Sequence, residues 1–346
     1  NRFHFYRRCS SVFLHFLEIP IYNAAAGSPP RRRSEQVSHK MLNQRTIAKA
    51  VHAIGVGVHS AEKVRLTLRP AEENSGIRFV RSDLPEMNSI QAHAENVSDT
   101  MLSTSIGDSS LQVATVEHLM AALWGMGIDN IMIELSAPEV PILDGSAAPF
   151  MDLIASAGIV EQKDRKQFIR IKREVKVTQG DGHASLKPYA GFKGSYTFVS
   201  SHRAYESFPK SVSLDFSSVS FIESVGGARS FGLMEELSQA QAINKCLGSS
   251  LENAVGVTVD GVVNPEGLRF DDEFVRHKLL DAIGDLYLLG KPILGEFEGY
   301  ASGHSLNNKL ARALLRCEDA WDLVDFDVSV GNLIQPIIHP EIVSAG

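Results

Sequence analysis

The sequence contains few cysteines and no long apolar run, and each scarcity excludes a class of protein. The 3 cysteines among 346 residues are too few and too scattered for a disulfide framework or a cysteine-based zinc site. A reducing compartment such as the cytoplasm is the simpler expectation, and any bound metal would be held by histidine and carboxylate. The apolar stretch at residues 11–22 includes a glutamate and a proline and is too short to span a membrane.

Basic residues are also in the minority. The chain has 34 Lys and Arg against 41 Asp and Glu, and this net charge of -7 gives no support for nucleic-acid binding. The shares of hydrophobic residues (44%) and charged residues (22%) are typical of a soluble globular protein. The length is sufficient for two domains with separate cores.

Residues 1–40 form a basic N-terminal extension with seven basic and two acidic residues, a net charge of about +5. We interpret it as a disordered or non-native extension, with Met41 as the true start. A secretory signal and an Arg-rich organellar transit peptide stay open as minor alternatives.

From Met41 onward the pattern is rich in strands, with two helices expected in each half. Alternating residues 64–68 predict a strand, and residues 115–123 predict a helix with Thr115 as its N-cap. A second helix is expected at residues 149–157. Residues 162–167 are polar and charged and are the expected linker. A helix followed by a glycine and a strand occurs once in each half, which suggests duplication, although shared packing needs would give the same pattern.

The helix expected at residues 271–285 has two distinct faces. At about 100° per residue, His277, Lys278, Asp281 and Asp285 share one stripe, and leucines occupy the opposite face. An imidazole and a carboxylate at positions i and i+4 can bind a metal, although such pairs are also common on helix surfaces. If the helix that begins with Glu117 and His118 faces this one, His118, His277 and Asp281 form a three-ligand site that leaves one zinc position open.

Two acid–base candidates lie near these residues in the sequence. Glu117 adjoins a possible ligand and could act as a base toward metal-bound water. His304 lies at an expected strand-to-helix junction, where Asp285 could hold it protonated. The simpler alternative is that Ser305 caps a helix and His304 is solvated.

Several long motifs follow one another along the chain, at residues 44–46, 55–60, 100–102, 115–119, 127–130, 141–147, 274–285 and 303–309. In the same order, these motifs resemble those of the LpxC family, the zinc-dependent UDP-3-O-acyl-N-acetylglucosamine deacetylases of Gram-negative bacteria. The resemblance implies an α+β fold of two similar domains, each a β-sheet with two helices, packed helix layer to helix layer. The expected domain I is residues 41–163 and domain II is residues 168–332, with an acyl-chain insert near 198–231 and a tail at 333–346.

The resemblance also implies the reaction, which is hydrolysis of the N-acetyl group of an acylated UDP-N-acetylglucosamine to give the free amine and acetate. This is the committed step of lipid A biosynthesis, carried out by a cytoplasmic protein that we expect to be monomeric. A non-catalytic UDP-sugar or acyl-chain binding protein on the same fold is the alternative, and the presence of all the presumed metal and acid–base residues argues against it.

The family's functional residues can be carried over position by position. His118, His277 and Asp281 match the zinc ligands, Glu117 the general base, and His304 a protonated histidine with Asp285 as its partner. The resemblance further implies a Thr197 that stabilises the tetrahedral intermediate and an acyl passage formed by Phe198, Phe221 and residues 228–232. The expected substrate-binding residues are Lys278, Phe198, His59, Met101 and Leu102. Ala301 stands where the family pattern can have a lysine near the diphosphate.

Overall fold

The computed structural model describes residues 41–86, 88–217 and 219–326. The expected N-terminal extension, residues 1–40, and the expected tail, residues 333–346, lie outside the described residues. Within the described part of the chain, no helix is both long enough and apolar enough to cross a membrane.

The first half is built on a five-stranded sheet whose central strand is β9. The strand order is β2 (Val51–Val56), β3 (Lys63–Pro70), β9 (Ile131–Leu135), β4 (Ile77–Arg81) and β5 (Ser89–Gln91). Strand β3 confirms the alternation expected from the sequence, because Val64, Leu66 and Leu68 are buried while their neighbours are more exposed. A smaller sheet follows, formed by β6 (Val97–Asp99), β7 (Ser105–Gly107) and β8 (Gln112–Val113).

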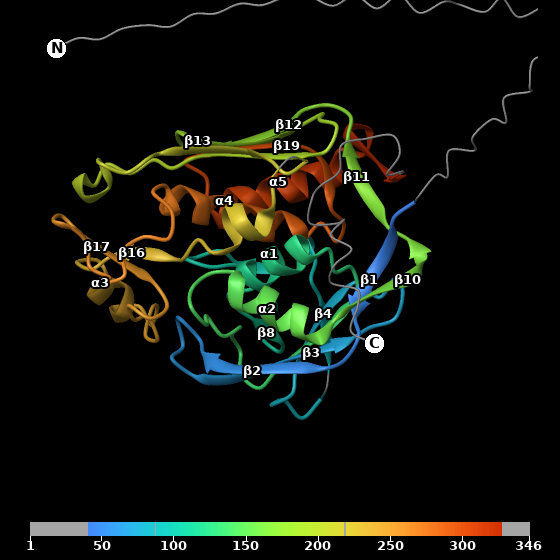
Figure 1. Cartoon of the computed structure of the whole chain (residues 1–346), viewed down its shortest axis with the longest axis horizontal. Coiled ribbons are helices and arrows are strands. Elements are labelled where there is room, and N and C mark those ends of the chain that lie inside the picture. The colour runs from blue at the N-terminus through green and yellow to red at the C-terminus, as the bar shows by residue number, and fades with distance from the viewer. Residues whose placement is uncertain (1–40, 87, 218, 327–346) are drawn as a thin grey trace, which may run out of the picture. The chain divides into compact units, whose positions relative to one another are not determined.

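Two helices cover one face of this sheet, α1 (Glu117–Met126) and α2 (Ala148–Ala157) (Figure 1). Every residue of α1 is buried, so the helix has no solvated side. The expected N-cap at Thr115 is wrong: the helix begins after Val116, and the Thr115 hydroxyl donates to Glu139 Oε1 at 2.9 Å. Gly127 ends the helix at a φ of 67°, a conformation that favours glycine.

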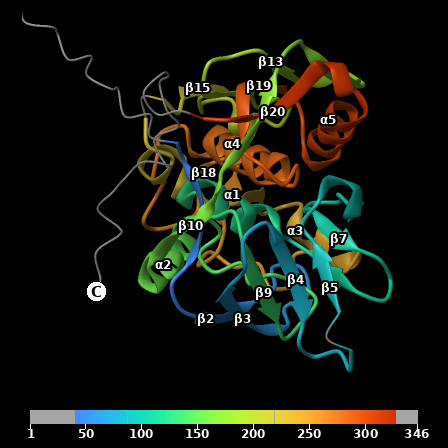
Figure 2. The same ribbon diagram turned by 90° about the vertical axis from the view of Figure 1, so that its right-hand side faces the viewer.

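The second half has a larger sheet with the strand order β12 (Val175–Gln179), β13 (Gly182–Lys187), β19 (Ile293–Tyr300), β11 (Gln167–Ile171) and β20 (Trp321–Asp325). Strand β14 (Phe192–Thr197) pairs with β19 and with β15 (Ser211–Asp215). Helices α4 (Glu273–Tyr287) and α5 (His304–Arg316) lie under this sheet, facing α1 and α2 (Figures 1 and 2). The result is sheet, helices, helices, sheet, which confirms the expected fold class.

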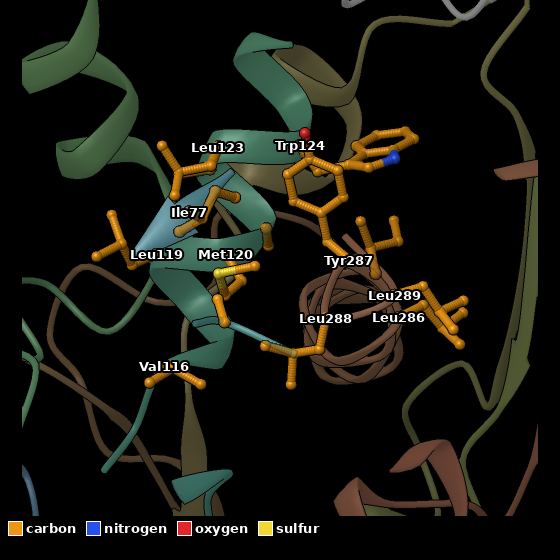
Figure 3. Close-up of a cluster of buried hydrophobic side chains, with 14 of the residues drawn as sticks. Ile77, Val116, Leu119, Met120, Leu123, Trp124, Leu286, Tyr287, Leu288 and Leu289 are labelled. Atoms are coloured by element: carbon orange, nitrogen blue, oxygen red, sulfur yellow. The ribbon is translucent and has the colours of Figure 1, made fainter. Parts of the chain in front are cut away.

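The helix layers meet mainly through α1 and α4. Figure 3 shows the apolar part of this contact, where Tyr287 of α4 and Leu288, which follows it, lie beside Met120 and Trp124 of α1. The Tyr287 hydroxyl donates to the Ile128 carbonyl at 2.7 Å, which satisfies its only polar atom inside the core. Of the polar stripe of α4, His277, Asp281 and Asp285 are buried, and Lys278 is half-buried.

The expected linker at residues 162–167 is mostly strand. Strand β10 (Ile159–Arg165) pairs with β1 (Asn43–Ile47), and Lys166 is buried with its Nζ 2.7 Å from Asp129 Oδ2 and 2.9 Å from the Gly127 carbonyl. The short connection between the halves is thus anchored to the end of α1. The domain limits 163 and 168 stay a prediction.

A third group of elements projects from the second half. It contains β16 (Phe231–Leu233), α3 (Leu237–Ala242), β17 (Val255–Thr258) and β18 (Gly261–Val262) (Figure 1). A π-helical turn, Ile222–Gly226, precedes these elements in the chain. Phe221, which precedes the turn, is fully buried 5.4 Å from the Trp124 ring. Short 3-10 turns complete the described chain at Ala94–Asn96, Arg203–Tyr205 and Glu318–Ala320.

Candidate metal centre

Three side chains from α1 and α4 converge on one point. His118 Nε2 lies 3.3 Å from Asp281 Oδ1, and His277 Nε2 lies 3.4 Å from the same oxygen. The two imidazole rings meet edge to face with centroids 5.0 Å apart. All three residues are buried, and their candidate ligand atoms lie within 4.8 Å of one another. The structure thus brings together the three residues that the sequence predicts as ligands.

The donor set and its spacing fit a metal ion. Ligand atoms about 2.0–2.2 Å from a tetrahedral ion lie roughly 3.3–3.5 Å apart, which agrees with the distances from Asp281 Oδ1. Among the described residues, neither Asp281 Oδ1 nor His118 Nδ1 has a hydrogen-bond partner, although both atoms are buried. A buried carboxylate oxygen between two imidazole nitrogens needs a cation to compensate its desolvation.

The protonation states also suit metal binding. His277 Nδ1 donates to the Ala228 carbonyl at 3.0 Å, which leaves Nε2 as the unprotonated nitrogen. Burial lowers the pKa of His277 to about 3, so the ring is neutral at physiological pH. Burial alone would raise the pKa of Asp281, but neighbouring cationic groups, the Lys278 ammonium among them, hold it well below its usual range. Lys278 Nζ lies 2.8 Å from Asp281 Oδ2, leaving Oδ1 free for a metal.

A carboxylate and a histidine lie beside this centre. Glu117 Oε1 is 3.9 Å from His304 Nε2, and Glu117 Oε2 accepts the Thr104 N–H at 3.0 Å. Burial raises the pKa of Glu117, which makes the carboxylate a stronger base. His304 Nδ1 donates to Asp285 Oδ2 at 2.9 Å. Burial alone would lower the pKa of His304, but the Asp285 carboxylate more than reverses this and raises it to about 9.

Sequence reasoning missed two residues that hold this acid–base pair. The Thr104 hydroxyl donates to Asp285 Oδ1 at 2.5 Å, while its N–H binds Glu117. Asn307 Nδ2 donates to Asp285 Oδ2 at 2.9 Å. In the sequence, the only signals for these two residues are the Ser-Thr-Ser run at residues 103–105 and the position of Asn307 one helical turn after His304.

Glu117, His304 and the three candidate metal ligands line one end of a cavity of about 640 Å³. The other end is lined by Leu233, Met234, Leu237, Leu251 and Val255 from the third group of elements. An apolar chain attached to a polar group would therefore find both environments in one cavity.

Not all of the expected substrate residues reach this cavity. His59, Leu102 and Lys278 line it, whereas Met101 is 55% exposed and, like Phe198, lies outside the lining. The Thr197 hydroxyl lies 3.1 Å from Ser211 Oγ in a separate hollow on the sheet, so the structure does not bring Thr197 to the centre.

Of the residues expected to form the acyl passage, Ser230, Phe231 and Gly232 line the cavity, whereas Phe198 and Phe221 do not. Only Ser230 and later residues of the expected 198–231 insert line the cavity, and most of the apolar wall lies between residues 231 and 256. Phe198 packs edge to face against Phe231, with ring centroids 5.5 Å apart. Phe198 is therefore placed behind a residue of the wall.

The site has two histidines and one carboxylate beside a Glu–His pair and a half-apolar cavity, an arrangement typical of metal-dependent hydrolases. The family model described as "LpxC: UDP-3-O-acyl N-acetylglycosamine deacetylase" matches residues 44–316. The chain therefore belongs to the LpxC family.

Two bacterial relatives align along almost their whole length. The UDP-3-O-acyl-N-acetylglucosamine deacetylase of Marinobacter nauticus is 53% identical over 287 residues, which cover 83% of this chain and 94% of the relative. The protein of the same name from Hahella chejuensis is 51% identical over 287 residues, covering 83% of this chain and 95% of the relative. Residues 1–40 lie outside the region matched by the family model.

Proposed function

We propose that this protein is a zinc-dependent deacetylase acting on UDP-3-O-(3-hydroxyacyl)-N-acetylglucosamine. It hydrolyses the N-acetyl group to the free amine and acetate, the committed step of lipid A biosynthesis. The observation that carries the proposal is the convergence of His118, His277 and Asp281 beside Glu117 and His304. The names of the two relatives support the choice of substrate.

His118, His277 and Asp281 would hold the zinc ion. Two imidazole nitrogens and one carboxylate oxygen form a ligand set that zinc accepts, and a fourth position would remain for water or substrate. A zinc ion held there would lower the pKa of a bound water toward 7 and would polarise the amide carbonyl.

The two acid–base residues would divide the proton transfers. The Glu117 carboxylate takes a proton from the water molecule whose oxygen forms the new bond to the acetyl carbon. The bond between that carbon and the sugar nitrogen then breaks, and the nitrogen takes a proton from His304 Nε2. Asp285 holds the opposite ring nitrogen, so His304 is protonated and oriented before the reaction begins.

The cavity provides places for the rest of the substrate. The acyl chain would occupy the apolar end, between Leu233 and Leu251. Lys278, which carries a positive charge at the polar end, would lie near the sugar or diphosphate, and His59 and Leu102 would contact the same ligand. This arrangement assigns no contact with the substrate to three of the expected residues, which lie outside the cavity lining: Met101, Thr197 and Phe198. A cytoplasmic location and a monomeric state stay predictions.

Metal analysis combined with acetate release from the acylated UDP-sugar tests the proposal. We expect about one zinc per chain and turnover of this substrate. The Glu117→Ala variant should retain zinc because the three metal ligands are unchanged. It should lose most of the rate because the base is absent. Protein that binds zinc and leaves the substrate intact would contradict the proposal. Substrate binding without metal or turnover would instead favour a binding protein.

A further inference from the structure

The carboxylate of Glu273, at the start of α4, has no part in the proposed reaction and is 0% exposed. Glu273 Oε1 accepts the Arg229 N–H at 3.0 Å and Arg229 Nε at 2.8 Å. Glu273 Oε2 accepts the Arg269 N–H at 2.7 Å and Arg229 Nη2 at 3.2 Å. A buried carboxylate with this many donors is fixed in both position and orientation.

One of these donors links Glu273 to the metal centre. The Arg229 N–H belongs to the peptide bond between Ala228 and Arg229. The carbonyl oxygen of that same peptide bond accepts Nδ1–H of His277 at 3.0 Å. Because the peptide bond is planar, with C=O and N–H pointing in opposite directions, it joins two side chains that stand one helical turn apart on α4.

We propose that Glu273 is a positioning residue for the metal centre and acts on His277 through the Ala228–Arg229 peptide bond. Its negative charge fixes the peptide plane and polarises the carbonyl oxygen that orients His277. The imidazole is thereby held as the Nδ1–H tautomer, with Nε2 directed toward Asp281. The inference rests on the proposed function, since it takes His118, His277 and Asp281 as the metal ligands.

Glu273 could instead stabilise the fold only through its ion pair with the Arg229 guanidinium, and a second carboxylate on that guanidinium separates this role from the positioning of His277. The Arg229 guanidinium also binds Glu266 Oε1 at 2.6 Å and the Gly267 carbonyl at 2.7 Å. Glu266 therefore pairs with the same guanidinium, but its described bonds go to that group and to Asn264, away from the peptide bond. Glu266→Gln is a matched control for Glu273→Gln.

The experiment measures zinc affinity by competition with a chromogenic chelator, using the full chain and requiring no activity. We expect Glu273→Gln to weaken zinc binding by about 10-fold or more, as the loss of a group supporting a ligand typically does. Glu266→Gln should stay within about twofold of the unmodified protein, because His277 is untouched. Thermal unfolding of the metal-free variants reports any shared loss of stability separately.

Three results would overturn the inference. The first is unchanged zinc affinity in folded Glu273→Gln, and the second is an equal loss in Glu273→Gln and Glu266→Gln. If Glu273→Gln does not fold, Glu273→Asp keeps the charge but withdraws it from the Arg229 N–H. Unchanged zinc affinity in Glu273→Asp is the third. An unmodified protein that binds no zinc would instead contradict the proposed function.

Discussion

The α-carbon of Gly284 lies against the carbonyl oxygen of Glu117. A methyl group added at Gly284 would come within 2.0 Å of that oxygen and 3.1 Å of the Ala121 nitrogen. This close approach of α4 to α1 allows His118 and Asp281, on different helices, to lie 3.3 Å apart. The geometry of the metal centre therefore depends on the absence of a side chain at Gly284, which is not itself a candidate ligand.

Gly284→Ala should push the two helices apart. The methyl group meets backbone atoms that cannot rotate away, so we expect a loss of about 1–3 kcal/mol in the free energy of unfolding together with weaker zinc binding. Denaturant unfolding and metal titration measure the two effects. Gly227→Ala is the control, because its methyl group would meet only Phe270 at 3.7 Å. Unchanged zinc affinity in Gly284→Ala would show that the helix separation does not set the ligand geometry.

Thr104→Val should reduce turnover without removing the metal. The substitution keeps the shape of the side chain but leaves Asp285 Oδ1 without its 2.5 Å hydrogen bond. We expect kcat to fall on the order of 10-fold, as loss of a bond to a buried charge implies. Zinc content should be unchanged, and Thr104→Ser should recover most of the rate.

A matched control for this change is Thr46→Val. Thr46 is buried, and its hydroxyl accepts the Ala71 N–H far along the chain from the acid–base pair. An equal fall in kcat for both valine variants, or no recovery with Thr104→Ser, would mean that Thr104 acts only through general stability.

The part of the site that could be predicted from the sequence follows helical periodicity. Positions 277, 281 and 285 share one face whatever surrounds the helix, so the polar stripe of α4 was visible in the sequence. The contact of Thr104 with Asp285 joins residues 181 positions apart, and no local pattern encodes such a contact. Phe198 and Phe221, which were expected in the acyl passage, lie outside the cavity lining for a related reason. The apolar wall comes from short strands and turns with little periodicity, and Phe221 packs on Trp124 instead.

The pH dependence of turnover should have an alkaline limb set by His304. Its pKa, raised to about 9 beside Asp285, keeps Nε2 protonated at neutral pH. The pKa of His304 in the folded protein exceeds the ordinary histidine value of about 6.5. The stabilisation from its pairing with Asp285 is therefore fully present below about pH 6.5. It is lost as the pH rises through about 9. Turnover should fall over that upper range.

Asp285→Asn should move this limb toward lower pH by about one unit or more, because the group that raises the pKa loses its charge. Glu117 and Asp281 also favour protonated His304, so the shift is partial. The measurement is kcat against pH at saturating substrate. A limb that stays in place in Asp285→Asn would assign the alkaline limb to another group.

Leu237→Asp tests whether the apolar end of the cavity holds the acyl chain. Leu237 lines that end from α3, and a carboxylate there would oppose burial of hydrocarbon. We expect KM for the acylated substrate to rise on the order of 10-fold, equivalent to about 1.4 kcal/mol. The value of kcat should change little because the acid–base pair is unaltered. Leu323→Asp is the control, since Leu323 is 46% exposed on β20 and lies outside the cavity lining. An equal KM in the two variants would place the acyl chain elsewhere. A rise in KM confined to Leu237→Asp, and smaller for substrates with shorter acyl chains, would locate the acyl chain against α3.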